Sequence, residues 1–368
     1  MPHGRYGVVK NKSMLEFYKG KNVFVTGHTG FKGSWLCRML IKAGANVTGY
    51  SLNLPTSPSL FKLANIKQDM ISINGDIRDL DSLRKAFLES KPEVVFHLAA
   101  QSLVRKSYAN PVETYSTNVM GTVNILECIR NSSFVKSFLN VTTDKVYQNN
   151  EWEWGYREID PLDGFDPYSN SKSCSELATH SYKSSFFADN RIAISTARAG
   201  NVIGGGDFSK DRIIPDCVRA IENNEKIIIR NPHSIRPYQH VLEPIYAYLL
   251  IVEKQYKNKK LADYYNIGPD ECDCISTESL VNLFCEKWGD DGPQREIKND
   301  IQNSHEANFL KLDCSRLKMK FGWQPCWNIN EAVEKTVDWT KAYFAKNDVV
   351  KVMDQQIEEF LEIENSKT

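Results

Sequence analysis

The chain has 368 residues, 41% apolar and 25% charged, which suits a folded globular protein with one large domain and a smaller one. Lysine plus arginine and aspartate plus glutamate each number 46, and this zero net charge argues against nucleic acid or an anionic membrane surface as a partner. No C-x-x-C pair, membrane-length apolar run or signal-peptide pattern is present, so we expect a cytoplasmic protein.

From Lys21 onward, short β-rich runs alternate with segments of helical periodicity, and residues 1–20 are expected to be an N-terminal extension. The expected strands are 22–27, 46–52, 70–77, 93–100, 135–143 and 191–202. Helical patterns lie between them at 31–45, 79–90 and 111–131. Because parallel strands need helical crossovers, this alternation predicts an α/β fold with a Rossmann-type, doubly wound parallel sheet over residues 21–200.

The pattern changes after Gly200. A loop rich in Gly and Asp leads into a helix from Pro215, followed by short strands at 226–230 and 264–268 and a Tyr-rich helix after Pro244. An amphipathic helix is expected at 329–346. We expect residues 201–350 to form mainly a smaller α/β substrate domain, with about 238–268 returning to complete the first domain and 351–368 forming a C-terminal helix or tail.

The run "VTGHTGFKGSWL" places Gly27, Gly30 and Gly33 between the first strand and the first helix. Glycines there permit a tight turn and bring a pyrophosphate close to backbone N–H groups at the helix N-terminus. Thr29 and Phe31 belong to the same loop. The second strand ends with neutral Ser51 and Asn53 and with no arginine for a 2′-phosphate, so NAD is favoured over NADP as the cofactor.

Two further strand ends are candidate cofactor contacts. Asp76 and Ile77 follow the third strand and could contact the adenine edge, although Asp76 could instead only cap a turn. The fourth strand ends in Leu98, Ala99 and Ala100, whose small alanines leave room for a flat ligand beside the sheet.

Tyr168 and Lys172 are four residues apart on an expected helix and therefore share a face. A tyrosine with a pKa of about 10 is a poor base at neutral pH. A neighbouring ammonium and the positive ring of NAD lower that pKa, so the pair could take a hydroxyl proton while hydride leaves the same carbon. Thr143, at the end of the fifth strand, could hydrogen-bond the same hydroxyl.

The runs "GHTGFKGSWL", "TTDKVY", "DPYSNSK", "ARAGNVIGGGDF" and "RPYQHVLEP" resemble those of the extended short-chain dehydrogenase/reductase family. The resemblance extends over residues 21–343, and within the nucleotide-sugar branch the runs are similar to those of the CDP-glucose 4,6-dehydratases. It implies CDP-D-glucose as the substrate: oxidation at C4, loss of water across C5 and C6, and return of hydride to C6. The implied product, CDP-4-keto-6-deoxy-D-glucose, would serve deoxysugar synthesis of the O-antigen or lipopolysaccharide type.

The stretch "TTDK" bears on dehydration itself. Asp144 is the candidate general acid for the departing C6 hydroxyl, which requires a carboxyl kept neutral by burial. An epimerase has no such need, although Asp144 could instead be a strand-end carboxylate held by Lys145 or by nearby N–H groups. In the dTDP-glucose dehydratases a Glu follows the acid and serves as the C5 base. We hypothesise that Lys145 moves the C5 proton here; it could also stabilise an enolate oxygen or hold Asp144.

A nucleotide diphosphate needs cations and backbone donors. The resemblance favours Arg236 and Asn201 as substrate contacts, and Arg212 and Arg219 are further candidates. Lys32 stands inside the glycine loop, where many relatives have an apolar residue. A cation there opposes the helix dipole, which favours a role at a phosphate or at the substrate over simple coverage of the helix end.

Several alternatives remain open at this point. The chain could be a dehydratase for dTDP-, GDP- or UDP-sugars, a 4-epimerase, or a non-catalytic dinucleotide-sensing regulator. The resemblance implies a homodimer formed through helices at 111–131 and 168–187, with a tetramer as the alternative. The aromatic residues Trp152, Trp154 and Tyr156 could wall the active site or belong to an ordinary core. The seven histidines show no paired ligand spacing, so no metal site is expected.

Overall fold

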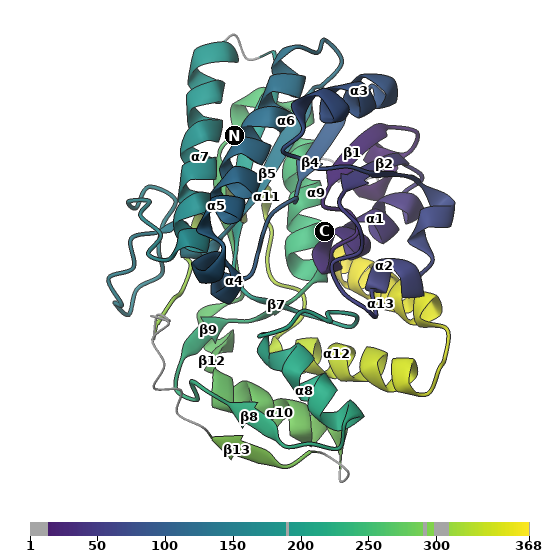
Figure 1. Cartoon of the computed structure of the whole chain (residues 1–368), viewed down its shortest axis with the longest axis vertical. Coiled ribbons are helices and arrows are strands. Elements are labelled where there is room, and N and C mark those ends of the chain that lie inside the picture. Colours follow the sequence, from purple (N-terminus) through teal and green to yellow (C-terminus); the bar gives the residue numbers. More distant parts are fainter. Residues whose placement is uncertain (1–13, 189–190, 290–292, 298–308, 368) are drawn as a thin grey trace, which may run out of the picture.

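The computed structural model describes residues 14–188, 191–289, 293–297 and 309–367. Seven parallel strands form one sheet in the order β11-β6-β5-β4-β1-β2-β3, which confirms the predicted fold class (Figure 1). The strands are β1 Asn22–Thr26, β2 Asn46–Ser51, β3 Ile71–Asn74, β4 Val94–His97, β5 Ser137–Thr143, β6 Ala193–Ala199 and β11 Tyr264–Ile267.

Helices cover both faces of this sheet (Figure 1). One face is covered by α3 Leu80–Ser90, α6 Gly121–Arg130 and α7 Pro167–Phe186, with α4 Val104–Ala109 and α5 Pro111–Tyr115 beside them. The other face is covered by α1 Phe31–Lys42, α9 Leu242–Lys257 and α13 Val349–Ser366, with α2 Leu60–Leu63 and α11 Ser315–Phe321 nearby. None of the described helices is long and apolar enough to cross a bilayer.

Strand β5 lies in the interior of the sheet, and its sequence fits that position. All seven of its residues are buried. Successive side chains point to opposite faces, so Phe138 belongs to the core under α3 and α6 while Leu139 belongs to the core under α1 and α9. The strand ends with Thr143 at the carboxyl edge of the sheet, where doubly wound folds bind their ligands.

The helix predicted at 111–131 is interrupted by a π turn, Ser116–Met120, between α5 and α6. The wider turn carries the buried Asn118. Its Oδ1 accepts a hydrogen bond of 2.8 Å from the Gln101 amide, and its Nδ2 donates to the Gln101 carbonyl at 3.0 Å and to Ser171 Oγ at 2.8 Å. The π turn therefore fixes the loop that follows β4 against helix α7.

A second lobe lies below the carboxyl edge of the sheet (Figure 1). Its helices are α8 Ile213–Glu222, α10 Thr277–Trp288 and α12 Ile329–Phe344. Three short ladders accompany them: β8 Ile227–Ile229 with β13 Arg295–Ile297, β9 Ile235–Pro237 with β12 Cys274–Ser276, and β7 Val202–Ile203 with β10 Gln239–His240. The lobe has its own core, which includes Ile214, Leu280, Phe284 and Val333. The exact domain boundaries stay a prediction.

The chain returns from this lobe to the sheet. Helix α9 packs on β5 and β6, and β11 then adds a seventh strand beside β6. At the N-terminus, residues 1–13 lie outside the described part of the chain. The extension predicted to reach residue 20 is wrong for its last part, because Met14–Tyr18 form a 3-10 helix. The fully buried Tyr18 donates a hydrogen bond of 2.6 Å to the Leu249 carbonyl of α9.

Candidate active site

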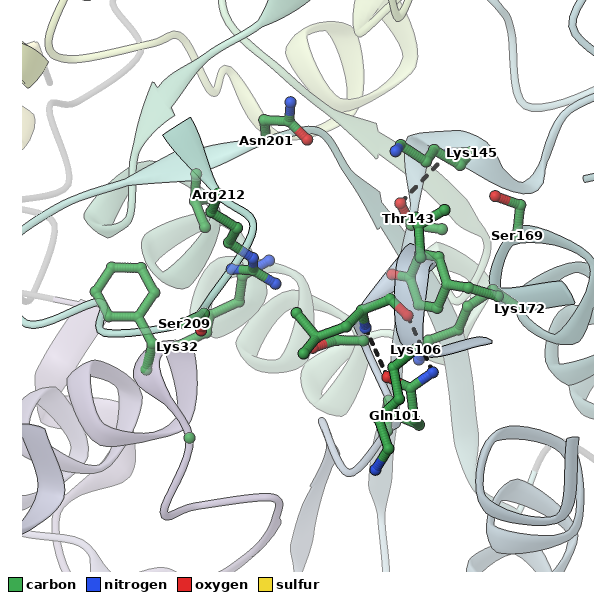
Figure 2. A pocket seen from close by; sticks show the side chains of 18 of the residues that line it. Lys32, Gln101, Lys106, Thr143, Lys145, Ser169, Lys172, Asn201, Ser209 and Arg212 are labelled. Carbon is green, nitrogen blue, oxygen red and sulfur yellow. Dashed lines mark hydrogen bonds between the residues drawn. The ribbon is translucent and has the colours of Figure 1, made fainter. Parts of the chain in front are cut away.

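A cavity of about 1190 Å³ lies between the carboxyl edge of the sheet and the second lobe (Figure 2). The loops after β1 to β6 line one side, and residues of α8, β8 and β9 line the other. It brings together every predicted cofactor residue: Gly27, Thr29, Gly30, Phe31, Gly33, Asp76, Ile77, Leu98, Ala99, Ala100, Tyr168 and Lys172.

The glycine loop is built so closely that side chains would not fit at two of its positions. Gly27 has φ of +75°, and a Cβ there would lie 2.7 Å from the Ala99 amide nitrogen. A Cβ on Gly33 would lie 2.3 Å from the Gly27 carbonyl oxygen. Helix α1 begins after Gly30, and no side chain caps it. Its first backbone N–H groups therefore suit the pyrophosphate of a dinucleotide.

As the sequence indicated, the cavity-lining residues at the end of β2 include no carboxylate. Ser51 and Asn53 line the cavity at the end of β2, and Thr29 Oγ1 lies 2.8 Å from Ser51 Oγ. Asp76 lines the cavity after β3, and its carboxylate is held by the Arg78 guanidinium, which lowers the pKa of Asp76. Asp76 therefore stays ionised, and Ile77 lines the cavity beside it.

Helix α7 carries Tyr168 and Lys172, the two residues predicted to act together as the base. Asp166 caps the helix by accepting a hydrogen bond of 3.0 Å from the Ser169 amide, and Pro167 occupies its first turn, which fixes where the helix starts. Tyr168 and Lys172 then follow one turn apart. Lys172 Nζ donates a hydrogen bond of 3.0 Å to the Val141 carbonyl of β5, so the lysine is anchored to the strand that carries Thr143.

The electrostatics of this pair are dominated by burial. Desolvation lowers the pKa of Lys172 to about 8, and the charge of Glu176 opposes that shift. Burial raises the pKa of Tyr168 to about 12, while a hydrogen bond with Thr143 and the positive charge of Arg212 favour the phenolate. Lysine and tyrosine are thus both shifted toward their neutral forms, which brings the lysine closer to the working pH range and moves the tyrosine further from it.

Asp144, the residue after Thr143, is 1% exposed; it is not among the residues that line the cavity, although its neighbours Thr143 and Lys145 are. Its Oδ1 accepts a hydrogen bond of 2.9 Å from the Thr143 hydroxyl, and Oδ2 is buried without a hydrogen-bond partner among the described residues. Burial raises the pKa of Asp144, and the charges of Lys145, Arg236 and Lys32 oppose this only in part. A carboxyl with one unpartnered oxygen and a raised pKa suits a neutral acid that can donate a proton.

Three of the predicted substrate cations line the cavity, as does Asn201. Lys32 Nζ lies 3.2 Å from the Tyr248 hydroxyl, and burial together with the charges of Arg212 and Lys172 lowers the pKa of Lys32 to about 7. Arg236 is buried and its Nη1 donates to the Ile235 carbonyl at 2.9 Å. Figure 2 shows Lys32 and Arg212 across the cavity from Thr143 and Lys145.

Arg219 is not among the residues that line the cavity. Its guanidinium donates to the carbonyl oxygens of Phe208 at 3.3 Å and Ser209 at 3.1 Å and pairs with Asp216 on the same helix. In this structure its donors brace the loop that enters α8, and a substrate contact stays a prediction for this residue. The loop itself brings Arg212 to the cavity.

Two residues of the aromatic run, Trp152 and Tyr156, belong to a small core rather than to the cavity wall. Tyr156 is buried, its ring stacks on Tyr147, and Trp152 stacks on Tyr156 in turn. None of Trp152, Trp154 and Tyr156 is among the described residues that line the cavity. The structure therefore supports the ordinary core for Trp152 and Tyr156, whereas Trp154 is 65% exposed and fits neither interpretation.

Some cavity residues carried no recognisable sequence signal. Arg105 of α4 and Arg230, just after β8, both pair with Asp211, at 3.6 Å and 3.1 Å, so a carboxylate of the second lobe joins cations from both sides of the cavity. Gln101 also lines the cavity, and it is held by Asn118 of the π turn, which has no compositional signature. No group of three potential metal ligands occurs among the described residues.

The sequence is similar to known proteins along most of its length. A family model described as GDP-mannose 4,6 dehydratase matches residues 24–336. The CDP-glucose 4,6-dehydratase of Salmonella typhimurium is 47% identical over 351 residues, which cover 94% of this chain and 97% of that protein. The dTDP-D-glucose 4,6-dehydratase of Homo sapiens is 27% identical over 88% of this chain and 91% of its own length.

Solved structures show the same fold at low sequence identity. A UDP-glucose 4-epimerase of Stenotrophomonas maltophila with bound NAD and formylated UDP-arabinopyranose has a TM-score of 0.78 at 18% identity, covering 89% of this chain and 99% of that one. The dTDP-glucose 4,6-dehydratase of Bacillus anthracis in complex with NAD has a TM-score of 0.72 at 20% identity, covering 90% and 99%. With the family model and the 47% identical relative, the chain belongs to the nucleotide-sugar 4,6-dehydratases of the extended short-chain dehydrogenase/reductase family.

Proposed function

We propose that the protein is an NAD-dependent hydro-lyase that converts CDP-D-glucose to CDP-4-keto-6-deoxy-D-glucose. The observation that carries the proposal is the buried, partly unpartnered carboxyl of Asp144 at the end of β5, next to the cavity-lining Thr143 and across from helix α7 with Tyr168. A 4-epimerase moves hydride and a C4 proton but expels no hydroxyl, so it needs no acid there. The CDP form of the substrate is supported by the 47% identical relative.

The cofactor would be held by the glycine loop and the ends of β3 and β4. The two close-built glycines and the uncapped N-terminus of α1 fit a dinucleotide pyrophosphate, and the absence of an arginine at Ser51 and Asn53 favours NAD over NADP. When bound, NAD supplies a hydride acceptor for the sugar C4 and, once reduced, a hydride donor for C6.

Proton transfers are assigned to the protein. As the phenolate, Tyr168 Oη takes the proton of the C4 hydroxyl, and Thr143 positions Asp144 by donating its hydroxyl proton to Oδ1. The resulting ketone acidifies C5–H. As the neutral amine, the form of a lysine that can accept a proton, Lys145, which lines the cavity, takes the C5 proton and returns it after elimination, and Asp144 donates a proton to the departing C6 oxygen so that water leaves. No net oxidation occurs, and one water is released per turnover.

Substrate binding is assigned to the cations on the second-lobe side. Arg236, Arg212 and Asn201 would meet the diphosphate, and Lys32 would reach the diphosphate or the sugar from the glycine loop. We also propose a homodimer through α5, α6 and α7. These helices and the π turn between α5 and α6 expose Val112 at 82%, Met120 at 50% and Leu177 at 55%, apolar side chains that a partner could cover.

The test is incubation of the purified protein with CDP-, dTDP-, UDP- and GDP-glucose, with and without added NAD, followed by mass spectrometry. Loss of one water from the CDP-glucose sample, without net NADH, is the expected result. Tyr168→Phe serves as the control and should leave the sugar unchanged. A new C4 epimer of unchanged mass would instead make the protein an epimerase, and water loss confined to another nucleotide would overturn the CDP assignment.

A further inference from the structure

A buried ion pair lies directly behind the proposed reacting groups. Glu176 of α7 and Arg198 of β6 have side chains that are 1% and 3% exposed. Arg198 donates from Nε to Glu176 Oε1 at 2.8 Å and from Nη2 to Glu176 Oε2 at 2.6 Å. This bidentate geometry fixes the guanidinium and the carboxylate in one orientation relative to each other. A charge pair this deeply buried is costly unless further hydrogen bonds satisfy it.

Those further hydrogen bonds come from the sheet. Thr142 Oγ1 donates to Glu176 Oε1 at 2.6 Å, and Thr196 Oγ1 donates to Oε2 at 3.0 Å. Arg198 Nη1 donates to the Tyr147 hydroxyl at 2.8 Å. The carboxylate thus accepts four hydrogen bonds, from β5 and from β6, and it ties helix α7 to both strands.

The location of this anchor relates it to catalysis. Glu176 lies one turn after Lys172 on α7, and its partner Thr142 lies between Val141, which accepts the Lys172 hydrogen bond, and Thr143. The same carboxylate therefore sets the register of the helix that carries Tyr168 and Lys172 against the strand that carries Thr143 and Asp144.

The charges around the Lys172 amine give Glu176 a second effect. From α1, Lys32, whose own pKa is lowered to about 7, acts against an ammonium at Lys172 only while it is itself protonated, and from β4, His97 is fully buried with a lowered pKa and is therefore neutral. Tyr168, on α7 itself, is neutral in its protonated form. Glu176 is the anion whose charge favours the protonated form of Lys172, against the burial that lowers the pKa of that amine to about 8.

We propose that Glu176 is a positioning residue for the reaction: its carboxylate, locked by Arg198, Thr142 and Thr196, holds Lys172 as an ammonium ion and sets α7 in register with β5. The catalytic part of this inference rests on the proposed function, whereas the protonation of Lys172 can be measured without any substrate.

Two single variants separate the charge of Glu176 from its shape. Glu176→Gln keeps the shape and removes the charge, and Glu176→Asp keeps the charge one methylene shorter. The readout is the titration of Lys172 by NMR of ¹⁵N-labelled lysine, with the signal assigned by its loss in Lys172→Met. We expect the midpoint to fall by about one pH unit or more in Glu176→Gln and to stay near the wild-type value in Glu176→Asp. An unchanged midpoint in Glu176→Gln would overturn the proposal.

Activity provides an independent check. If the reaction requires Lys172 as an ammonium ion, the alkaline limb of the plot of kcat against pH should shift to lower pH in Glu176→Gln. In Glu176→Asp the limb should keep its position, even if the absolute rate is reduced. A merely structural role would lower the rate in both variants without moving that limb. If the wild-type protein dehydrates no nucleotide sugar, the proposed function fails, and the NMR titration still decides the role of Glu176.

Glu176→Gln leaves the Arg198 charge buried and unpaired, so this variant could fail to fold. The double variant Glu176→Gln/Arg198→Met removes both charges and avoids that problem. Because the charge of Glu176 acts on Lys172 and Arg198 is not among the groups that shift its pKa, the midpoint should still fall relative to the wild type. An unchanged midpoint in the folded double variant would also refute the proposal.

Discussion

The hydroxyl of Thr143 donates a hydrogen bond of 2.9 Å to Oδ1 of Asp144, so the two residues that end β5 are linked to each other without any ligand. This bond occupies one carboxyl oxygen and leaves Oδ2, buried beside Gly200, as the atom that can carry a proton to a substrate. Thr143 thereby orients Asp144, the acid of the proposed reaction.

Replacing Asp144 should separate oxidation from elimination. Asp144→Asn keeps the size of the side chain but cannot donate an acidic proton, so we expect the rate of water loss to fall by about 10²- to 10⁴-fold while C4 oxidation continues. NADH absorbance should therefore accumulate with CDP-glucose. Tyr168→Phe is the matched control, in which neither NADH nor dehydrated product should form. Near-normal water loss in Asp144→Asn would assign the acid elsewhere.

The role of Lys145 can be followed at the carbon that it is proposed to serve. In D₂O the wild-type enzyme should incorporate deuterium at C5 of the product. Lys145→Met should lose that incorporation together with turnover, while the partial reaction at C4 still produces NADH. If deuterium continues to enter C5 in Lys145→Met at the wild-type rate, another group moves this proton and Lys145 only holds an anionic oxygen or Asp144.

The glycine loop allows a comparison of two neighbouring glycines. A Cβ on Gly33 would lie 2.3 Å from the Gly27 carbonyl oxygen, whereas a Cβ on Gly30 would lie 3.4 Å from the same atom. Gly33→Ala should therefore force the loop away from α1, lowering the melting temperature and weakening NAD binding in calorimetry. Gly30→Ala should change the melting temperature little. Equal melting temperatures for the two variants would show that the loop adapts to a methyl group at either position.

Glu243 gives a prediction for stability against pH. Its Oε1 accepts hydrogen bonds from the Trp327 amide at 2.7 Å and the Cys326 amide at 3.0 Å, while burial raises the pKa of Glu243 from 4.5 to about 8. The folded state therefore binds this proton more tightly than the unfolded state. The resulting stability is complete below pH 4.5 and is lost as the pH rises through about 8.

Glu243→Gln removes this dependence. Between about pH 5 and about pH 9, the free energy of unfolding of the wild type should fall, relative to that of Glu243→Gln, by an amount on the order of 1 kcal/mol or more. Urea unfolding at several pH values measures the difference of slopes, which does not depend on any fixed cost of the substitution itself. Parallel slopes would contradict a raised pKa for this carboxyl.

The sequence was sufficient for those features that depend on local pattern. Buried β-rich runs separated by helical periodicity predicted the parallel sheet, and glycine spacing predicted the loop at Gly27 to Gly33. Motif resemblance selected Tyr168, Lys172 and Asp144 as candidates, and their roles stay predictions. The cap formed by Asp166 and Pro167 could also be recognised locally, since it depends on two adjacent residues.

What could not be predicted depends on contacts between distant segments. Arg219 resembled a phosphate contact by its position on α8, but carbonyl groups of the preceding loop bind its donors. Asn118 occupies a π turn that matches an ordinary helical pattern, and Glu176 meets its partner Arg198 across 22 residues of chain. In each case the side chain is ordinary for its element, and only the packed structure determines which group it meets.

The seventh strand has a consequence for how the protein is made. Strand β11, Tyr264–Ile267, pairs with β6 at the edge of the sheet, yet more than sixty residues that include α8 and β8 separate the two in the chain. A ribosome must therefore synthesise half of the second lobe before the sheet can be completed. The first lobe cannot finish folding as an independent N-terminal unit during translation, and both lobes should reach their final packing together.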